Sequence, residues 1–308
     1  MLKNEVQKIA VSDDTMIETL VDTADNQAVG IIHIFHGMSE HMERYDALVQ
    51  VLNQNGYHVI RHNHRGHGKE IDSKRGHFDS IAQVVQDAYE IQTTYRSQFE
   101  DHLPYIVLGH SMGSIIARQY LQQHSNEVDG MILSGTGLFP MWQGVFVIPL
   151  LKLITLIGSK KRITKWLNYI MVQQFNKPFK PLRTPSDWLS SDESQVDAYV
   201  NDPYSGFLVS NQLIYSVVKS MIQTGRHRNI KKIKSDVPIL MISGKEDSFG
   251  EQGKGVRRLG QKLKKGGIEH ITIQLYTNKR HEILFEKDHE NVWKHMLDWI
   301  SRQIIRKK

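Results

Sequence analysis

The stretch PYIVLGHSMGS (residues 104–114) decides the fold predicted for this chain. Residues 105–108 are apolar and indicate a buried strand, and a helical pattern opens directly after the serine. Ser111 therefore stands at a sharp corner, with Gly109 and Gly113 two residues to either side. We interpret these glycines sterically, because side chains there would collide across so tight a turn. The corner would lift a serine hydroxyl above the sheet, at a helix N-terminus that favours negative charge.

Short apolar runs recur along the chain and alternate with segments of helical spacing. The apolar runs are residues 29–35, 57–62, 105–109, 130–135, 237–244 and 271–276. Helical spacing is clearest in residues 44–56, 80–98 and 255–267. This alternation predicts an α/β fold with a mostly parallel sheet flanked by helices. Residues 5–22 add an antiparallel hairpin around a Ser-Asp-Asp turn at the start of the chain.

The alternation is interrupted once, between residues 137 and 232. This segment is helical in pattern, aromatic and basic, and no acidic residue occurs between Asp129 and Asp187. A break inside an alternating pattern is best explained by an insertion that sits on top of the sheet. We therefore predict a core made of residues 1–136 and 233–308, and a helical cap made of residues 137–232.

Composition excludes several classes of function. The 308 residues contain no cysteine, which excludes disulfides, a thiolate nucleophile and Cys-ligated metals and suits a reducing compartment. The net charge of +6 is accompanied by no nucleic-acid-binding motif, so we expect no nucleic-acid partner. The N-terminal sequence lacks the pattern of a secretory signal, and the apolar window 145–158 is too short to span a bilayer. We expect a cytoplasmic protein.

A serine nucleophile needs a base, and the base needs an orienting acid. The order expected for this kind of corner is serine, acid, histidine, with the histidine after the last strand. His281 follows the apolar run 271–276, and Asp247 follows the run before it, with Glu246 as the alternative acid. The competing interpretation is that His281 is an ordinary loop histidine and that Asp247 and Glu246 are ordinary solvated carboxylates of a turn. Asp202 lies in the insertion and would be out of order.

Two backbone N–H groups are expected to bind the oxyanion of such a reaction. The residue after the nucleophile supplies one, which is Met112. The other should come from the loop IFHGMSEH (residues 34–41), where Met38 follows Gly37. Only the amides of the two methionines are implicated, since their side chains suit packing.

The stretch RHNHRGHG (residues 61–68) raises the question of a metal site. His62, His64 and His67 lie close together in sequence. We expect their side chains to diverge, because alternate residues of an extended segment point apart. We therefore predict no metal site and no cofactor.

Taken together, these motifs resemble the α/β-hydrolases grouped as monoacylglycerol lipases, lysophospholipases and serine aminopeptidase (S33)-like hydrolases. The resemblance is carried, in order, by HGMSEH (36–41), RYD (44–46), HRGHG (64–68), GHSMGS (109–114), SGKED (243–247) and RHEILFE (280–286). It implies the α/β-hydrolase fold with a helical cap, a Ser111–Asp247–His281 triad, and oxyanion donors at Met38 and Met112. It also implies hydrolysis of carboxylic esters, most directly those of monoacylglycerols or lysophospholipids.

Other functions stay open at this point. A peptidase or thioesterase could use the same triad, and a non-catalytic relative could bind a small molecule on the same fold. Ser111 argues against an epoxide hydrolase, which would need aspartate at the corner. The apolar stretch 139–158, with Phe139, Trp142 and Phe146, is followed by SKKRITKW and could contact the inner face of an anionic membrane; the alternative is a helix buried against the core. The sequence does not predict the acyl length, head group or oligomeric state.

Overall fold

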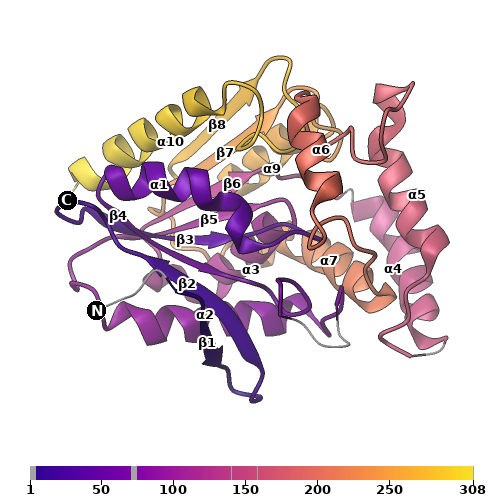
Figure 1. Ribbon diagram of the computed structural model, residues 1–308, viewed down its shortest axis with the longest axis horizontal. Helices are drawn as coiled ribbons and strands as arrows, with labels where there is room; N and C mark the ends of the chain where they lie inside the picture. Colours follow the sequence, from indigo (N-terminus) through magenta and orange to yellow (C-terminus); the bar gives the residue numbers. More distant parts are fainter. Residues whose placement is uncertain (1–4, 71–74, 140, 158, 308) are drawn as a thin grey trace.

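The protein is described here by a computed structural model, which covers residues 5–70, 75–139, 141–157 and 159–307. For residues 141, 142 and 307 it describes the backbone alone, so the predicted contribution of the Trp142 side chain lies outside the described residues. One eight-stranded sheet runs through the molecule, with helices on both of its faces (Figure 1).

The strands are β1 (Gln7–Ala10), β2 (Met16–Asp22), β3 (Gly30–Phe35), β4 (Tyr57–His62), β5 (Tyr105–His110), β6 (Gly130–Ser134), β7 (Ile239–Gly244) and β8 (Ile271–Tyr276). The helices are α1 (Asp46–Gln54), α2 (Ile81–Arg96), α3 (Met112–His124), α4 (Met141–Leu156), α5 (Lys165–Asn176), α6 (Glu193–Asn201), α7 (Asn211–Thr224), α8 (His227–Ile230), α9 (Lys254–Lys265) and α10 (His289–Gln303). Short 3-10 turns occupy Met42–Tyr45, Ser125–Glu127, Lys177–Phe179 and Ile305–Lys307.

The strand order in the sheet is β1-β2-β4-β3-β5-β6-β7-β8. The β1–β2 and β2–β4 pairs are antiparallel, and every later pair is parallel. This arrangement confirms the predicted α/β class and the N-terminal hairpin. The seventh strand begins at Ile239 rather than at the predicted residue 237, because Pro238 has no N–H to donate to the ladder.

Each face of the sheet has its own apolar core. On one face, the side chains of α1 and α10 pack together in a cluster that includes Leu48, Leu52, Trp293 and Met296. On the other face, α2, α3 and α9 share a larger cluster (Figure 1). The central strands are buried on both sides, which explains their continuous apolar runs.

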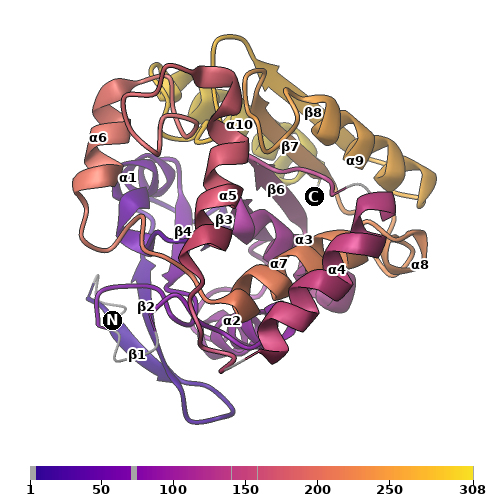
Figure 2. The same ribbon diagram turned by 90° about the vertical axis from the view of Figure 1, so that its right-hand side faces the viewer.

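The segment between β6 and β7 is helical, as its sequence predicts. Helices α4 to α8 all fall in it; Figures 1 and 2 show α4, α5 and α6 beyond one end of the sheet, whereas the short α8 packs on α9. Helix α7 packs on α3, and α4 packs on α7. In the part of the chain that the structure describes, none of the helices has both the length and the apolar character needed to cross a membrane.

Candidate active site

Ser111 occupies the corner between β5 and α3 in a strained backbone conformation. Its φ is 51° and its ψ is −115°, a left-handed geometry that costs a residue other than glycine about 1–3 kcal/mol. The corner is held by a hydrogen bond from the Ser111 N–H to the carbonyl oxygen of Ser134 at 3.0 Å. The hydroxyl is therefore presented from a backbone that its neighbours keep bent.

The two flanking glycines are required by different neighbours. A Cβ at Gly109 would collide with the carbonyl of Gly113, which is the clash across the turn that we predicted. A Cβ at Gly113 would instead collide with the carbonyl of Phe35, at the end of β3. Gly113 thus lets α3 approach the neighbouring strand β3. The predicted collision across the turn is therefore the reason for Gly109 only.

The structure brings Ser111, His281 and Asp247 together from three separate loops. His281 Nε2 lies 2.8 Å from Ser111 Oγ, and His281 Nδ1 lies 3.0 Å from Asp247 Oδ1. Asp247 and His281 are fully buried, whereas Ser111 is half-buried. Glu246, the alternative acid, is half-buried beside Asp247, and it is Asp247 that meets the imidazole.

The Asp247 carboxylate is stabilised in its ionised form. Burial on its own would raise its pKa, but the neighbouring His281 and hydrogen bonds from His281, Ser243 and the Gly250 backbone lower the pKa below its usual value. The Ser243 hydroxyl donates to Oδ2 at 2.9 Å, so both carboxylate oxygens have partners. An ionised carboxylate on Nδ1 keeps the Nε2 lone pair of His281 turned to the serine.

The predicted oxyanion loop lies next to the corner. A Cβ built on Gly37 would be 3.3 Å from the Cβ of Ser111. Among the hydrogen bonds recorded within the described part of the chain, neither Met38 N–H nor Met112 N–H has an acceptor. Met112 is the first residue of α3, where a helix leaves its N–H groups unpaired. Both predicted donors are therefore free to bind a ligand oxygen.

A chain of buried histidines, which was not predicted, supports this loop. Hydrogen bonds link Tyr105 Oη to His33 Nδ1 (2.5 Å), His33 Nε2 to His62 Nδ1 (2.8 Å), His62 Nε2 to His64 Nδ1 (3.1 Å) and His64 Nε2 to the His36 carbonyl (3.2 Å). Burial lowers the pKa of His33, His62 and His64 well below the usual histidine value, so these imidazoles are neutral. Because a carbonyl only accepts, a neutral His64 carries its proton on Nε2, and the same assignment passes back along the chain to the Tyr105 hydroxyl.

The histidine chain corrects the expectation for residues 61–68. The side chains of His62 and His64 do not diverge, because residues two apart lie on the same side of an extended segment. They are hydrogen-bonded to each other, and burial lowers the pKa of both well below the usual histidine value. No group of three or more His, Asp or Glu side chains in the described ranges is arranged to hold a metal ion.

A buried ion-pair network also holds the oxyanion loop. The Glu40 carboxylate accepts the Gly37 N–H and pairs with Arg44, which forms a bidentate pair with Glu282 at 2.7 and 2.8 Å. Burial on its own would raise the pKa of Glu40, but the charge of Arg44 and the Gly37 hydrogen bond lower it. The network joins the loop after β3 to the residue that follows His281. Glu40, Arg44 and Glu282 were not predicted as site residues.

The helical segment between β6 and β7 contacts the same loop. The Tyr199 hydroxyl and the Gly206 N–H donate to the carbonyl of Ser39 at 3.0 and 2.9 Å, and the Ser39 hydroxyl donates to the Phe207 carbonyl at 2.8 Å. Asp202, which the sequence places out of order for a triad acid, lies 2.7 Å from His41 Nε2. Its role is therefore to attach this segment to the loop after β3.

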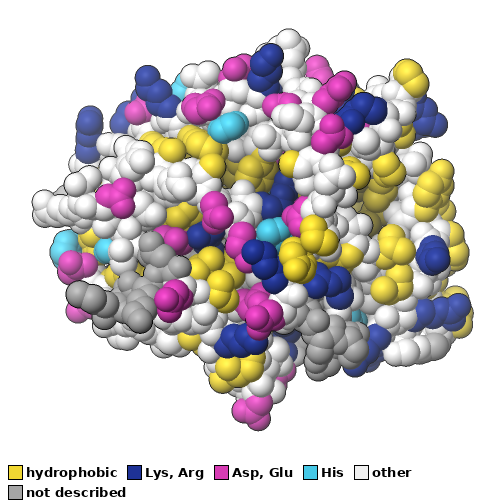
Figure 3. Space-filling model, in the orientation of Figure 1, with side chains coloured by type: hydrophobic (Ala, Val, Ile, Leu, Met, Phe, Trp, Pro, Cys, Tyr) yellow, Lys and Arg dark blue, Asp and Glu magenta, His cyan; other side chains and the backbone are white. Residues whose placement is uncertain are grey.

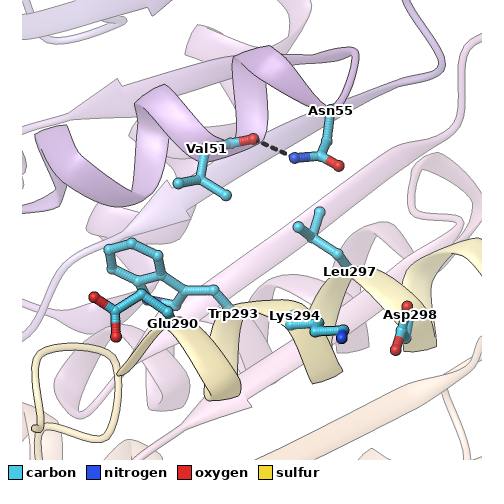
Figure 4. Close-up of a pocket in the computed structure, with 7 residues that line it drawn as sticks. All are labelled: Val51, Asn55, Glu290, Trp293, Lys294, Leu297 and Asp298. Carbon is cyan, nitrogen blue, oxygen red and sulfur yellow. Dashed lines mark hydrogen bonds between the residues drawn. The ribbon is translucent and has the colours of Figure 1, made fainter. Parts of the chain in front are cut away.

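Two surface cavities lie outside this constellation. One of about 400 Å³ lies between α1 and α10 and is lined by Val51, Asn55, Glu290, Trp293, Lys294, Leu297 and Asp298 (Figure 4). Another of about 230 Å³ lies between α6 and the loop after β3, beside Arg44 and Tyr199. Neither contains Ser111, Asp247 or His281 in its lining.

A parallel sheet with a strained serine between β5 and α3, an aspartate after β7 and a histidine after β8 defines an α/β-hydrolase. The model of the family described as "Serine aminopeptidase, S33" matches residues 26–288, and the chain belongs to this family. The resemblance predicted from the motifs is thereby confirmed.

Relatives named as monoacylglycerol lipases match the chain over most of its length. It is 27% identical to a monoacylglycerol lipase of Mycolicibacterium smegmatis over 280 residues, 90% of each chain. It is 25% identical to the monoglyceride lipase of Rattus norvegicus over 282 residues, 89% of this chain and 83% of the relative. A thermostable carboxyl esterase from Bacillus coagulans, solved in complex with glycerol, superposes with a TM-score of 0.87 at 27% identity and covers 98% of this chain and 99% of the other.

Proposed function

We propose that this ester hydrolase cleaves the acyl ester of monoacylglycerols or lysophospholipids, with Ser111 as nucleophile, His281 as general base and Asp247 as its orienting acid. The observation that carries the proposal is the contact of His281 Nε2 with Ser111 Oγ at 2.8 Å. The names of the relatives support the substrate class, since two of them are lipases of monoacylated glycerol.

Acylation follows from the positions of the three side chains. His281 takes the proton of the Ser111 hydroxyl, and the oxygen attacks the ester carbonyl. The oxyanion that forms would be bound by the N–H groups of Met38 and Met112, at the positive end of α3. The imidazolium is stabilised by the Asp247 carboxylate and then gives its proton to the leaving alcohol.

Deacylation repeats these steps with water. The acyl-enzyme carbonyl is attacked by a water molecule whose proton passes to His281, and the same two amides bind the second oxyanion. Ser111 then regains its proton and the carboxylic acid leaves. The cycle consumes one water and needs no cofactor.

We further propose that residues 137–232 form a cap that admits a lipid substrate from an anionic membrane surface. Fourteen large hydrophobic side chains are exposed among the described residues, and ten of them lie in one stretch of this segment. This α4–α5 patch consists of Val145, Phe146, Leu150, Leu153, Leu156, Ile157, Ile163, Trp166, Tyr169 and Ile170. Figure 3 shows hydrophobic side chains gathered on the right, over α4 and α5, with lysines and arginines beside them.

The arrangement of α4 favours this proposal over a fully buried helix. Leu151 is buried, whereas Phe146 on the same helix is 73% exposed. The exposed cations Lys152, Lys161 and Lys165 border the patch. Apolar side chains with adjacent lysines are typical of surfaces that lie on anionic bilayers.

The proposed function is tested by labelling and by a substrate panel. A fluorophosphonate probe should label the wild-type chain and leave Ser111→Ala unlabelled, and hydrolysis of a p-nitrophenyl ester should fall by roughly 10⁵-fold in that variant. Monoacylglycerols of graded chain length should be compared with a lysophospholipid, an acyl thioester and an aminoacyl amide. Preference for the amide would show that the protein is a peptidase rather than a lipase. Labelling of the Ser111→Ala variant would show that Ser111 is not the nucleophile.

A further inference from the structure

The loop that carries His281 is fastened to one short segment of the insertion, residues 183–191, which we call the strap. The Arg280 guanidinium donates from Nη1 to the carbonyls of Asp187 (2.5 Å) and Ser190 (3.0 Å). On the other side of the histidine, the Glu282 N–H donates to the carbonyl of Leu189 at 2.7 Å. Residues before and after His281 thus bind residues before and after Trp188.

A buried carboxylate also links the strap to the loop that carries His281. Glu286 is fully buried and accepts the Ser191 N–H at 2.8 Å and the Ser191 hydroxyl at 2.6 Å. It also accepts the Arg280 N–H at 2.6 Å. One side chain therefore ties the end of the strap to the start of the histidine loop, and the two segments are held in a fixed register.

This register places the indole of Trp188 against the His281 imidazole. The ring centroids are 4.6 Å apart and the planes are inclined by 32°. Trp188 is itself held in place, since its N–H donates to Asn176 Oδ1 at 3.0 Å and its ring packs on Phe175 at 4.7 Å. The indole is half-buried and lies between the histidine and the rest of the insertion.

The groups that face the imidazole leave one flat side to the indole. Asp247 meets Nδ1 and Ser111 meets Nε2, while the rings of His110 and Phe249 have their centroids 5.2 and 5.3 Å away. Asp247 and His110 are the titratable side chains in this set. The charged neighbours in sequence point elsewhere: Arg280 donates to the strap carbonyls, and Glu282 pairs with Arg44.

We propose that Trp188 is a positioning residue, which fixes the plane of the His281 imidazole and stabilises the imidazolium formed during catalysis. An aromatic face within about 6 Å of a cation attracts it, and the attraction grows where water is excluded. The neutral imidazole gains less, so the indole favours the transition state over the resting state. This inference rests on the proposed role of His281 as general base, and it assigns to the insertion a part in the chemistry besides substrate entry.

The test compares Trp188→Leu with Trp188→Phe on a short soluble ester. We expect Trp188→Leu to lower kcat roughly tenfold with little change in KM, and to move the acid limb of the kcat/KM profile to lower pH. Trp188→Phe keeps an aromatic face and should recover most of the loss. Met16→Leu, at an exposed position of β2 outside the site and the α4–α5 patch, is the control and should leave kcat and the pH profile unaltered. An unaltered kcat in Trp188→Leu, or an acid limb that stays in place or moves upward, overturns the proposal.

A second measurement does not depend on activity. In the Ser111→Ala background, the His281 ring protons can be titrated by NMR with and without Trp188→Leu, over the pH range in which both variants stay folded. We expect protonation at lower pH when the indole is removed, and equal titration curves would contradict the inference. Failure of the proposed function would appear separately, as esterase activity that survives Ser111→Ala, whatever the Trp188 variants do.

Discussion

His36 Nδ1 lies 2.7 Å from the carbonyl oxygen of Gly37 and donates a hydrogen bond to it. The backbone N–H of Met38 stands on the opposite edge of that same planar peptide, so an imidazole one residue earlier fixes its direction. His36 can donate in this way because its Nε2 accepts the backbone N–H of His64 at 2.9 Å. The proposed oxyanion donor is therefore oriented by histidines that must stay neutral.

We predict that the protein unfolds at mildly acidic pH. Burial lowers the pKa of His33, His36 and His67 to about 3 and that of His110 to about 4. The unfolded chain binds these protons near pH 6.5 and the folded chain does not, so the stability contribution is complete above that pH and is lost as the pH falls below it. Below pH 6.5, each buried histidine lowers the free energy of unfolding by about 1.4 kcal/mol per pH unit. Summed over these histidines, the loss should equal a typical folding free energy by about pH 5.

Urea unfolding monitored between pH 8 and pH 5 checks this prediction. His270 is exposed, so His270→Gln should leave the pH dependence unaltered. A free energy of unfolding that stays the same from pH 7.5 to pH 5.5 would show that the buried histidines accept protons in the folded state.

A second prediction separates the two candidate acids. Asp247→Asn should lower kcat by roughly 10³- to 10⁴-fold, because an amide can hold His281 in the wrong tautomer and cannot stabilise its charged form. Glu246→Gln changes the adjacent carboxylate and should keep kcat near the wild-type value. Steady-state kinetics on a p-nitrophenyl ester distinguish them, and a larger loss in Glu246→Gln would reverse the assignment.

A third prediction concerns the buried carboxylate of Glu40. Glu40→Ala leaves Arg44 with one partner fewer and frees the Gly37 N–H, so we expect a loss of about 3–5 kcal/mol in the free energy of unfolding and a lower kcat. Glu40→Gln retains an acceptor for the amide and should lose less of both. The exposed pair of Glu193 with Arg183 provides the comparison, since Glu193→Gln should cost less than about 1 kcal/mol. Equal costs at the two sites would argue against a structural role for the network.

A fourth prediction addresses the α4–α5 patch. The double variant Phe146→Ser and Trp166→Ser should bind vesicles rich in phosphatidylglycerol less tightly than the wild-type chain while hydrolysing a soluble ester at the same rate. Val200→Ser, at an exposed site on α6 outside the patch, is the control. Co-sedimentation with anionic and with neutral vesicles measures the effect. Equal binding to anionic and neutral vesicles would contradict the electrostatic part of the proposal. Unaltered vesicle binding by the double variant would contradict a membrane contact through the α4–α5 patch.

Sequence reasoning reached the features that local rules determine. A pattern of adjacent residues predicts the strand-to-helix corner at Ser111, and the order of the strands predicts the loops that carry Asp247 and His281. Alternating apolar runs predicted the sheet because central strands are buried on both faces. These features can be predicted from residues adjacent in the chain, or from the rule that the carboxyl ends of parallel strands meet at one edge of the sheet.

The remaining site features depend on contacts between segments distant in sequence. Trp188 meets His281 only because the strap folds back on the last loop, and nothing in the local pattern around either residue indicates that pairing. The sequence raises the question of a metal site at His62, His64 and His67 because it does not show their partners, whereas the structure joins His62 and His64 by hydrogen bonds to each other and to His33 of β3. The one signal that could have suggested this chain is the number of histidines in otherwise apolar strands, since a buried imidazole needs partners for both nitrogens.

The segment between β6 and β7 contacts both halves of the proposed reactive centre, at Ser39 beside the proposed amide donors and through the strap beside His281. A chimera that exchanged residues 137–232 for those of a relative would have to match these anchor points as well as the new substrate. Selectivity and turnover are therefore expected to change together in such hybrids, and swaps that leave residues 183–191 and the partners of Ser39 in place should be tolerated best.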